Sequence, residues 1–267
     1  MKKSLFDLFS MLNNNLPVSA DSEHELFGLA DAHDFAQAQD SFQYKQADID
    51  FLILYFSSEF DSSFLDEKTR ALFELSVNAF DAIVYAWMSE LPIEAEIIAF
   101  GRRVIAEAET AEGGLEEKRQ SAQRAAEDRG DSCTLTVLNA AAKVQFEAHH
   151  RMTGLLRFSP NEQGCYTARC EPDHFILPAL GEYFTARFGE TAWQIIDEKR
   201  GFCLSRQPPE TAKLQKTAER ADFAENGDEW EDLWRHYHKT INNESRNNPD
   251  LQRRFMPMRY RKYLPEV

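Results

Sequence analysis

Two short stretches of the sequence combine residue types that can transfer protons and hold phosphate. In the first, His149, His150 and Arg151 are followed by Arg157, and the second reads Glu171-Pro172-Asp173-His174. Histidine exchanges a proton near neutral pH, and the guanidinium of arginine donates two parallel hydrogen bonds to phosphate. We interpret Arg157 as a phosphate ligand. The candidate catalytic residues are His150, Arg151, Asp173 and His174.

Both stretches also have a structural interpretation. Cationic side chains near the C-terminus of a helix are stabilised by the helix dipole, which accounts for His149, His150 and Arg151 without any ligand. Asp173 could orient the His174 ring as a general base, but an aspartate that follows a proline turn is also a suitable N-cap. The sequence leaves both interpretations of each stretch open.

The C-terminal end is the third candidate, because basic and aromatic residues alternate there. Residues 233–265 contain eight basic side chains but only two acidic ones, a net charge of +6. Arginine and lysine neutralise backbone phosphate, and aromatic rings stack on bases. For Trp230 and Trp234 we favour the structural alternative, an aromatic core. Together with Arg157, the residues predicted to bind nucleic acid are Arg235, Lys239, Arg246, Arg253, Arg254, Arg259, Tyr260, Arg261, Lys262 and Tyr263.

The chain as a whole is acidic. Its 267 residues include 45 Asp and Glu against 30 Lys and Arg, a net charge of −15, and the entire acidic excess lies in residues 1–150. Such a field repels polyanions and limits indiscriminate binding to nucleic acid, whereas a concentrated basic end still holds phosphate locally because salt screens the distant charges. Alternatively, the basic end pairs with the acidic part of its own chain.

Apolar residues at helical spacing dominate the elements that must position these groups. Asp66 predicts an N-cap for a helix that continues to Met88. Residues 135–150 are predicted to be helical, with an apolar face formed by Val137, Leu138, Ala141, Val144 and Phe146. The predicted helices cover residues 5–12, 67–88, 93–107, 135–150 and 174–188, with an exposed helix or linker at 107–131, a linker at 208–227 and a last helix from 228. The predicted hairpins pair residues 155–158 with 165–169 and residues 193–197 with 202–205.

These elements predict an α+β fold, mostly helical, with a small antiparallel sheet built from two hairpins. We divide the chain into an acidic, mainly helical N-terminal region at residues 1–134 and an α+β domain at residues 135–267, which ends in the basic, aromatic segment. No apolar run approaches the roughly 20 residues that span a bilayer, and no signal sequence is visible. We therefore expect a cytoplasmic protein without membrane contact.

The cysteines at positions 133, 165, 170 and 203 are predicted to be reduced, because a chain with this much apolar sequence needs no disulfide framework. Cys165, Cys170, His174 and Cys203 form at most a loose zinc pattern, since structural zinc ligands usually come as closely spaced pairs. The sequence also lacks the phosphate-loop, dinucleotide-binding and iron–sulfur motifs. We predict no metal and no cofactor.

A longer pattern connects the candidate stretches. It consists of His150-Arg151-Met152, Gly154, Arg157-Phe158, Glu171-Pro172-Asp173-His174, Ile176-Leu177, Trp193, Ile195, Asp197, Lys199-Arg200-Gly201, Leu233-Trp234, Tyr237, Arg246-Asn247-Asn248-Pro249, Leu251-Gln252, Met256-Pro257, Tyr260 and Tyr263-Leu264. This pattern resembles a bacterial family of DNA-metabolism or DNA-repair proteins over about residues 135–267, with a fainter match around residues 75–104. An aromatic residue often follows the tyrosine at 260 in that family, where this chain has Arg261.

The resemblance implies a C-terminal domain of unknown function. In the family this domain is usually encoded beside a radical SAM protein that modifies or repairs DNA, and it occurs fused to uracil-DNA glycosylase-like domains. We therefore predict an accessory protein of DNA repair that binds DNA, a radical SAM repair partner, or both. One alternative is an enzyme that acts on a damaged nucleotide, with His150 or His174 as acid or base. Another is an adaptor whose acidic N-terminal part docks onto a basic partner.

Overall fold

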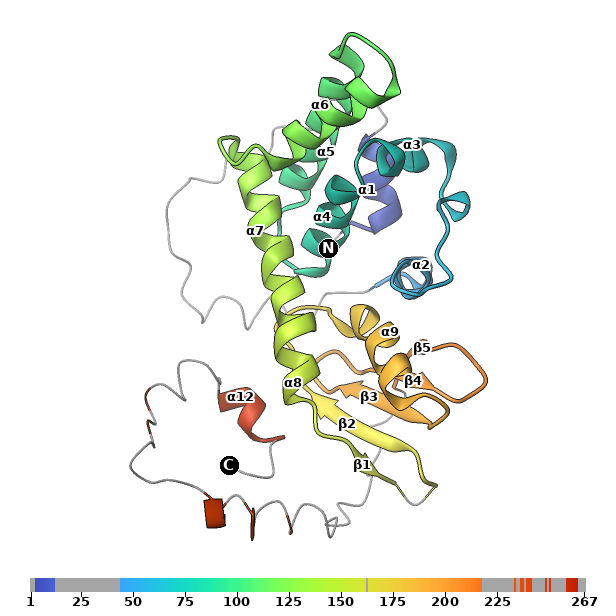
Figure 1. The fold of residues 1–267 in the computed structure, drawn as a ribbon, viewed down its shortest axis with the longest axis vertical. Helices are drawn as coiled ribbons and strands as arrows, with labels where there is room; N and C mark the ends of the chain where they lie inside the picture. Colours follow the sequence, from blue (N-terminus) through green and yellow to red (C-terminus); the bar gives the residue numbers. More distant parts are fainter. Residues whose placement is uncertain are drawn as a thin grey trace. The chain divides into compact units, whose positions relative to one another are not determined.

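A computed structural model describes residues 3–12, 44–161 and 163–217 and, near the C-terminus, residues 233, 236, 237, 239–241, 248, 250 and 258–263 (Figure 1). The chain divides into two compact units. Unit 1 comprises Met1–Leu52 and Glu59–Gln145, and unit 2 comprises Ile53–Ser58 and Phe146–Val267. Every candidate residue named from the sequence therefore belongs to unit 2.

Unit 1 is built from helices around an aromatic core. The rings of Phe9 and Phe80 stack with their centroids 5.0 Å apart, and Phe80, Trp87 and Phe100 are almost completely buried. Helix α5 contacts α1, α4 and α6. The helices are α1 (Leu5–Leu12), α2 (Gln46–Tyr55), α3 (Glu67–Leu75), α4 (Val77–Met88), α5 (Glu94–Thr110), α6 (Leu115–Glu127) and α7 (Ser132–Phe146), with a short 3-10 helix at Ser62–Phe64; α2 and α7 end in unit 2.

The predicted N-cap is confirmed, but two helices replace the single helix predicted over residues 67–88. The Asp66 carboxylate accepts hydrogen bonds from two backbone amides in the first turn of α3. The chain then leaves the helical conformation at Ser76, whose hydroxyl oxygen accepts a hydrogen bond from the Ala79 amide at 3.1 Å and so caps α4. A serine that can bond to the backbone two or three residues further on favours such a new start over a continuous helix.

Among the residues that the structure describes, no single helix is long and apolar enough to cross a membrane. The pair α3–α4, bent by 114°, passes the same test of length and composition when its two helices are taken together.

Helix α7 continues directly into a π-helix (Glu147–Met152) and then into α8 (Thr153–Leu155). The buried residues of α7 include Val137, Ala141 and Val144, as the sequence predicts. Phe146 was expected on this face but is 51% exposed, whereas the next residue, Glu147, is only 2% exposed. Phe146 lies two positions after Val144, roughly half a turn away, and thus faces away from the apolar stripe, whereas Glu147 lies three positions after Val144 and continues this stripe.

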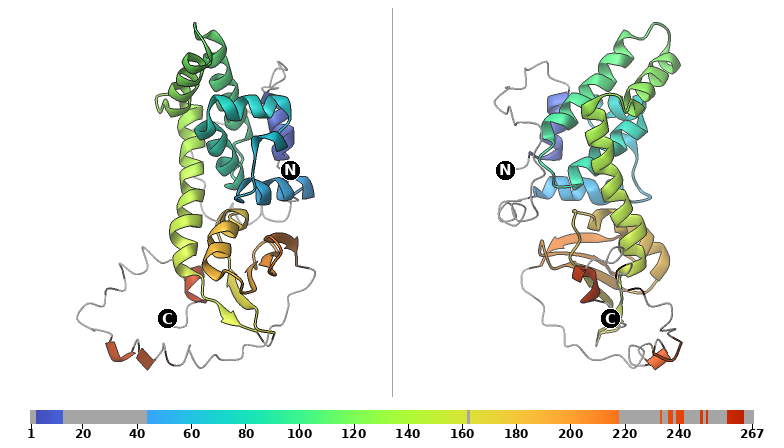
Figure 2. Two further views of the ribbon diagram at one scale, coloured as in Figure 1. Left: turned by 45° about the vertical axis from the view of Figure 1, so that its right-hand side comes forward. Right: turned by 90° about the vertical axis from the view of Figure 1, so that its left-hand side faces the viewer.

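Unit 2 contains a mixed sheet in which the strands follow the order β1-β2-β3-β4-β5. Helix α9 lies against this sheet and contacts β3 and β4, an arrangement that Figures 1 and 2 show from three directions. The elements are β1 (Ser159–Pro160), β2 (Tyr166–Cys170), α9 (Leu177–Phe188), β3 (Trp193–Asp197), β4 (Phe202–Arg206), β5 (Lys213–Lys216) and α12 (Met258–Arg261).

The α+β class with mostly helical content is confirmed, but the sheet is not made of two hairpins. The predicted hairpin of β3 and β4 is present, whereas β2 pairs with β3 in parallel. Helix α9 connects β2 to β3 and carries the chain back to the starting end of the sheet, which is what a parallel pair requires. Of the strand predicted at residues 155–158, Leu155 belongs to α8, and the antiparallel partner of β2 is instead the short β1 at residues 159–160. Strand β5 lies in the stretch predicted as a linker.

Candidate functional site

A buried carboxylate, Glu147, joins three segments of unit 2. Its Oε1 atom accepts hydrogen bonds from the Asp173 amide at 2.8 Å and from the Tyr260 hydroxyl at 2.5 Å, and its Oε2 atom accepts one from the His174 amide at 2.9 Å. Three donors compensate a carboxylate for the loss of water. Glu147 thereby ties the π-helix to the loop before α9 and to α12, which lies beside the end of the α7–α8 run in Figures 1 and 2.

The loop that contains Asp173 is held from its other side by Arg200. The Arg200 guanidinium donates to the carbonyl oxygens of Pro172 at 3.1 Å and Asp173 at 2.8 Å. It also pairs with the Asp197 carboxylate at 2.9 Å, and that carboxylate is fully buried and accepts from the Lys199 and Arg200 amides. Arg200 thus neutralises a buried acid and fixes the loop at the same time.

The structure corrects the predicted role of Asp173 as a helix cap. Helix α9 begins at Leu177, later than predicted, and its N-terminus has no side-chain cap. The amides of Asp173 and His174 point instead to Glu147. The predicted end of the helix at Gly189 is confirmed, because this residue takes φ +55°, a conformation that favours glycine.

A second carboxylate, Glu198, holds the turn that follows α12. It accepts hydrogen bonds from Arg169 Nη1 at 2.8 Å and from the Tyr263 hydroxyl at 2.6 Å, and Lys262 Nζ lies 3.6 Å away. Burial alone would raise the pKa of Glu198, but the bonds from Tyr263 and Arg169 outweigh it and hold this pKa below its usual value. Burial and the bond to Glu198 raise the pKa of Tyr263. Lys262 also pairs with Glu171.

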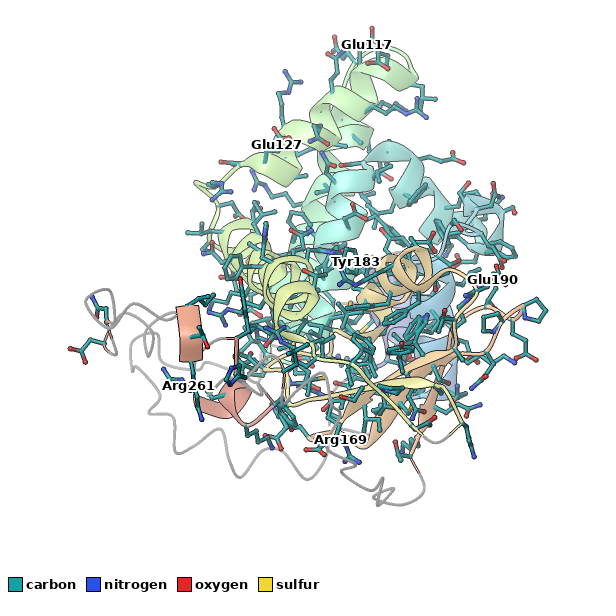
Figure 3. All side chains as sticks on the ribbon, turned by 60° about the horizontal axis from the view of Figure 1, so that its bottom comes forward. Glu117, Glu127, Arg169, Tyr183, Glu190 and Arg261 are labelled. Atoms are coloured by element: carbon teal, nitrogen blue, oxygen red, sulfur yellow. The ribbon has the colours of Figure 1, made fainter. Side chains whose placement is uncertain are left out.

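Of the residues predicted to bind nucleic acid, three contact carboxylates of unit 2, namely Tyr260, Lys262 and Tyr263. The surroundings of the other described residues differ. Tyr260 is 2% exposed, so its ring is not open to a base in this conformation, and Tyr263 and Lys262 contact Glu198. Arg261 is the last residue of α12 and is labelled in Figure 3. Its Nε and Nη2 atoms are shielded from solvent without a hydrogen-bond partner in the described part of the chain. Lys239 is exposed.

The remaining residues predicted to bind nucleic acid are Arg157 and five arginines whose side chains lie outside the described residues. Arg157 is described, and its Nη1 atom donates to the carbonyl oxygen of Gly154 at 2.8 Å. The side chain of Arg259 lies outside the described residues, as do Arg235, Arg246, Arg253 and Arg254.

His150 and Arg151 gather around the exposed ring of Phe146. The His150 and Phe146 ring centroids are 5.4 Å apart, and the Arg151 guanidinium carbon lies 5.3 Å from the Phe146 centroid. Partial burial and the neighbouring His150 lower the pKa of His149. Glu147 therefore brings the backbone of the predicted catalytic pair Asp173–His174 to the π-helix, while the described ring contact of His150 is with Phe146.

Sequence reasoning missed Glu147, Phe146 and the pair formed by Asp197 and Arg200. A charged residue type argues against burial of Glu147, although it lies three positions after Val144 and seven after Ala140, on the buried face of the helix. Asp197 and Arg200 carried a signal, because both belong to the pattern Asp197-x-Lys199-Arg200-Gly201. That pattern forms the β3–β4 turn, in which Gly201 adopts φ +66°.

The cysteines do not form a metal centre in the described residues. Cys133, Cys165, Cys170 and Cys203 are all free, and Cys165 and Cys170 are buried. Burial raises the pKa of each of these thiols. Within the described ranges, no three His, Cys, Asp or Glu side chains are close enough together to hold a metal ion.

Comparison with known proteins places the chain in one family. No curated protein and no solved structure matches it. Residues 112–266 match the family described as a domain of unknown function, DUF4130. This stretch is more than half of the 267 residues and includes the π-helix, the sheet and α12. The chain belongs to the DUF4130 family.

Proposed function

We propose that this chain is an accessory protein of DNA repair, which binds DNA through its cationic segment, defined as residues 233–265. The support is electrostatic: the segment has a net charge of +6 in a chain whose net charge is −15. Clustered cations bind a polyphosphate backbone because they release its condensed counterions. The acidic remainder of the chain repels DNA, which restricts binding to this segment.

Arg261 is the observation that carries the proposal. Removing a guanidinium from water without a partner costs free energy, and buried polar groups are normally paired. In the described part of unit 2, Arg200 and Arg169 are matched to carboxylates, whereas the Nε and Nη2 atoms of Arg261 are not. These two atoms form one bidentate edge of the guanidinium, which suits phosphate. A small rotation of the half-buried side chain would present this edge to a DNA backbone.

The contacts of Tyr260 in α12 and of Tyr263 in the following turn indicate a structural role for both tyrosines. Tyr260 and Tyr263 bond to Glu147 and Glu198, two carboxylates of the same unit. We assign these tyrosines to holding α12 in place, so that Arg261 and the neighbouring cations are presented from a fixed position. This assignment replaces our prediction that the two tyrosines bind nucleic acid directly.

The repair role and the partner rest on the sequence pattern of the family. The pattern includes the loop at Glu171-Pro172-Asp173-His174 and the turn at Lys199-Arg200-Gly201, which contact each other through Arg200. We propose that a radical SAM repair protein supplies the chemistry and that this chain supplies DNA contact. The ring contact of His150 with Phe146 favours such a binding role over the enzymatic alternative.

The test replaces four arginines with alanine, namely Arg253, Arg254, Arg259 and Arg261, and measures binding to a labelled oligonucleotide by fluorescence anisotropy at two salt concentrations. The slope of log affinity against log salt should fall by about 0.7–0.9 for each phosphate contact removed. A control with the same change in charge replaces four exposed cations of unit 1, Lys68, Arg124, Arg129 and Lys143. Equal affinity and slope in both variants would refute the proposal.

A further inference from the structure

Phe146 is an aromatic residue whose side chain is exposed rather than buried. Its ring is 51% exposed at the end of α7, although a phenylalanine is normally turned toward the core. A single exposed apolar residue needs no explanation by itself. Here, however, two further side chains from the π-helix are gathered around the exposed ring.

The π-helix is what brings those side chains to Phe146. Hydrogen bonds of a π-helix join residues five positions apart, so the residues four and five positions after Phe146 lie about one turn further along the same side. These are His150 and Arg151. The two rings are tilted by 37°, and the Arg151 guanidinium carbon lies 5.3 Å from the Phe146 centroid, which is within the range of a cation–π contact.

The resulting surface has the composition of a stacking site. It offers an exposed hydrocarbon ring, a second flat ring and a guanidinium in one small area, and His150 is itself exposed. Proteins that hold single-stranded nucleic acid combine aromatic rings, on which bases stack, with arginine near the backbone. In a duplex the faces of the bases are covered by their neighbours, so such a surface discriminates in favour of an unpaired base.

We propose that Phe146, His150 and Arg151 bind an unpaired base of single-stranded nucleic acid, with Phe146 as the stacking ring. The inference rests on the proposed function, to which it adds the form of the nucleic acid and the place where a base is held. Glu147, next to Phe146, accepts the hydrogen bond of Tyr260, next to Arg261. This one buried carboxylate therefore fixes both the helix that carries the stacking ring and the helix that carries the phosphate-binding arginine.

The experiment compares the full chain with Phe146→Ala, Phe146→Trp and Phe64→Ala. Anisotropy is measured with a labelled single strand and with the duplex of the same sequence. Phe64 is the matched control, since it is 61% exposed and belongs to unit 1. Loss of one stacked base weakens single-strand binding about tenfold in Phe146→Ala, whereas duplex binding stays within about twofold. Phe146→Trp retains the affinity, because tryptophan also stacks.

The outcomes separate this inference from the proposed function. If the unaltered chain binds neither single strand nor duplex, the proposed function fails and the inference fails with it. If the chain binds and the four-arginine variant is weakened, but Phe146→Ala binds like Phe64→Ala, the inference alone is overturned. An equal loss on single strand and duplex also overturns it. So does an unchanged DNA affinity together with the dissociation of an oligomer by Phe146→Ala, because the surface would then bind a second copy of this chain.

Discussion

The two units bury carboxylates in different ways. In unit 1, Asp48 is buried and accepts hydrogen bonds from the Ser4 hydroxyl at 2.7 Å and the Leu5 amide at 3.0 Å, and its pKa is raised because burial outweighs these bonds. In unit 2, the fully buried Asp197 pairs with a guanidinium, and Glu147 accepts a bond from Tyr260, 113 residues away.

Charged side chains have different structural roles in the two units. Unit 1 rests on aromatic and aliphatic packing, and its buried acid caps the start of a helix. Unit 2 uses ionised groups to connect segments that are distant in sequence, as the pair of Arg169 with Glu198 and the bonds of Arg200 to the loop at residues 172–173 show. Arg261 differs from these cations, because its Nε and Nη2 atoms are shielded from solvent without a hydrogen-bond partner in the described part of the chain.

The largest effect is expected from a comparison of two arginines of unit 2. Arg200→Met leaves the buried Asp197 carboxylate without its counter-charge and should lower the free energy of unfolding by about 3–5 kcal/mol. Arg261→Met removes a guanidinium that has no such partner and should leave the stability unchanged or slightly higher. Urea unfolding, with hydrogen exchange to locate the change in unit 2, measures both. A loss in Arg261→Met as large as that in Arg200→Met would contradict the account.

A smaller effect is expected at the junction between the π-helix and α12. Tyr260→Phe removes one of the hydrogen-bond donors of Glu147 and should cost about 1–2 kcal/mol, with faster amide exchange in residues 258–263. The matched control is Tyr183→Phe, because the Tyr183 side chain is exposed on α9. If the amides of residues 258–263 exchange at the same rate in both variants as in the unaltered chain, Tyr260 does not hold α12.

The smallest effect is expected in the pH dependence of the free energy of unfolding. A carboxylate of unit 2 and one of unit 1 should change this free energy in opposite directions as the pH falls. Glu198 has a folded pKa below its usual value of 4.5, so its contribution is present above that value and is lost as the pH falls through the folded pKa. Asp48 has a folded pKa above its usual 3.8, so stability declines as the pH rises from 3.8 through the folded pKa.

Acid unfolding of two conservative variants measures this difference. Glu198→Gln should reduce the loss of stability toward low pH, and Asp48→Asn should steepen it, since the compensating protonation of Asp48 is removed. If both variants change the loss of stability toward low pH in the same direction, the predicted opposite effects of Glu198 and Asp48 are wrong.

Local signals in the sequence were sufficient for much of the fold. The Asp66 cap, the hairpin of β3 and β4 and the helix end at Gly189 follow from residue types and spacing within one turn or hairpin. The parallel pairing of β2 with β3 did not follow, because it depends on where α9 returns the chain and no local residue encodes it.

The candidate site was predictable only in part. Its cations were visible as a charge pattern, and His150 and Arg151 were named from their chemistry. The exposure of Phe146 and the burial of Glu147 were not, because residue type argues against both, even though helical spacing after Val144 favours both. The anchoring role of Tyr260 depends on a contact across 113 residues, which composition cannot reveal.

The central claim is that unit 2 binds a polyanion through its cationic segment while the acidic unit 1 does not. The most direct test is a salt titration of oligonucleotide binding by the full chain, between about 50 and 200 mM salt, beside the four-arginine variant and its matched control. The account predicts a steep linear fall of log affinity with log salt, a shallower slope in the four-arginine variant and an unchanged slope in the control. Salt-independent binding, or one slope shared by all three proteins, would contradict it.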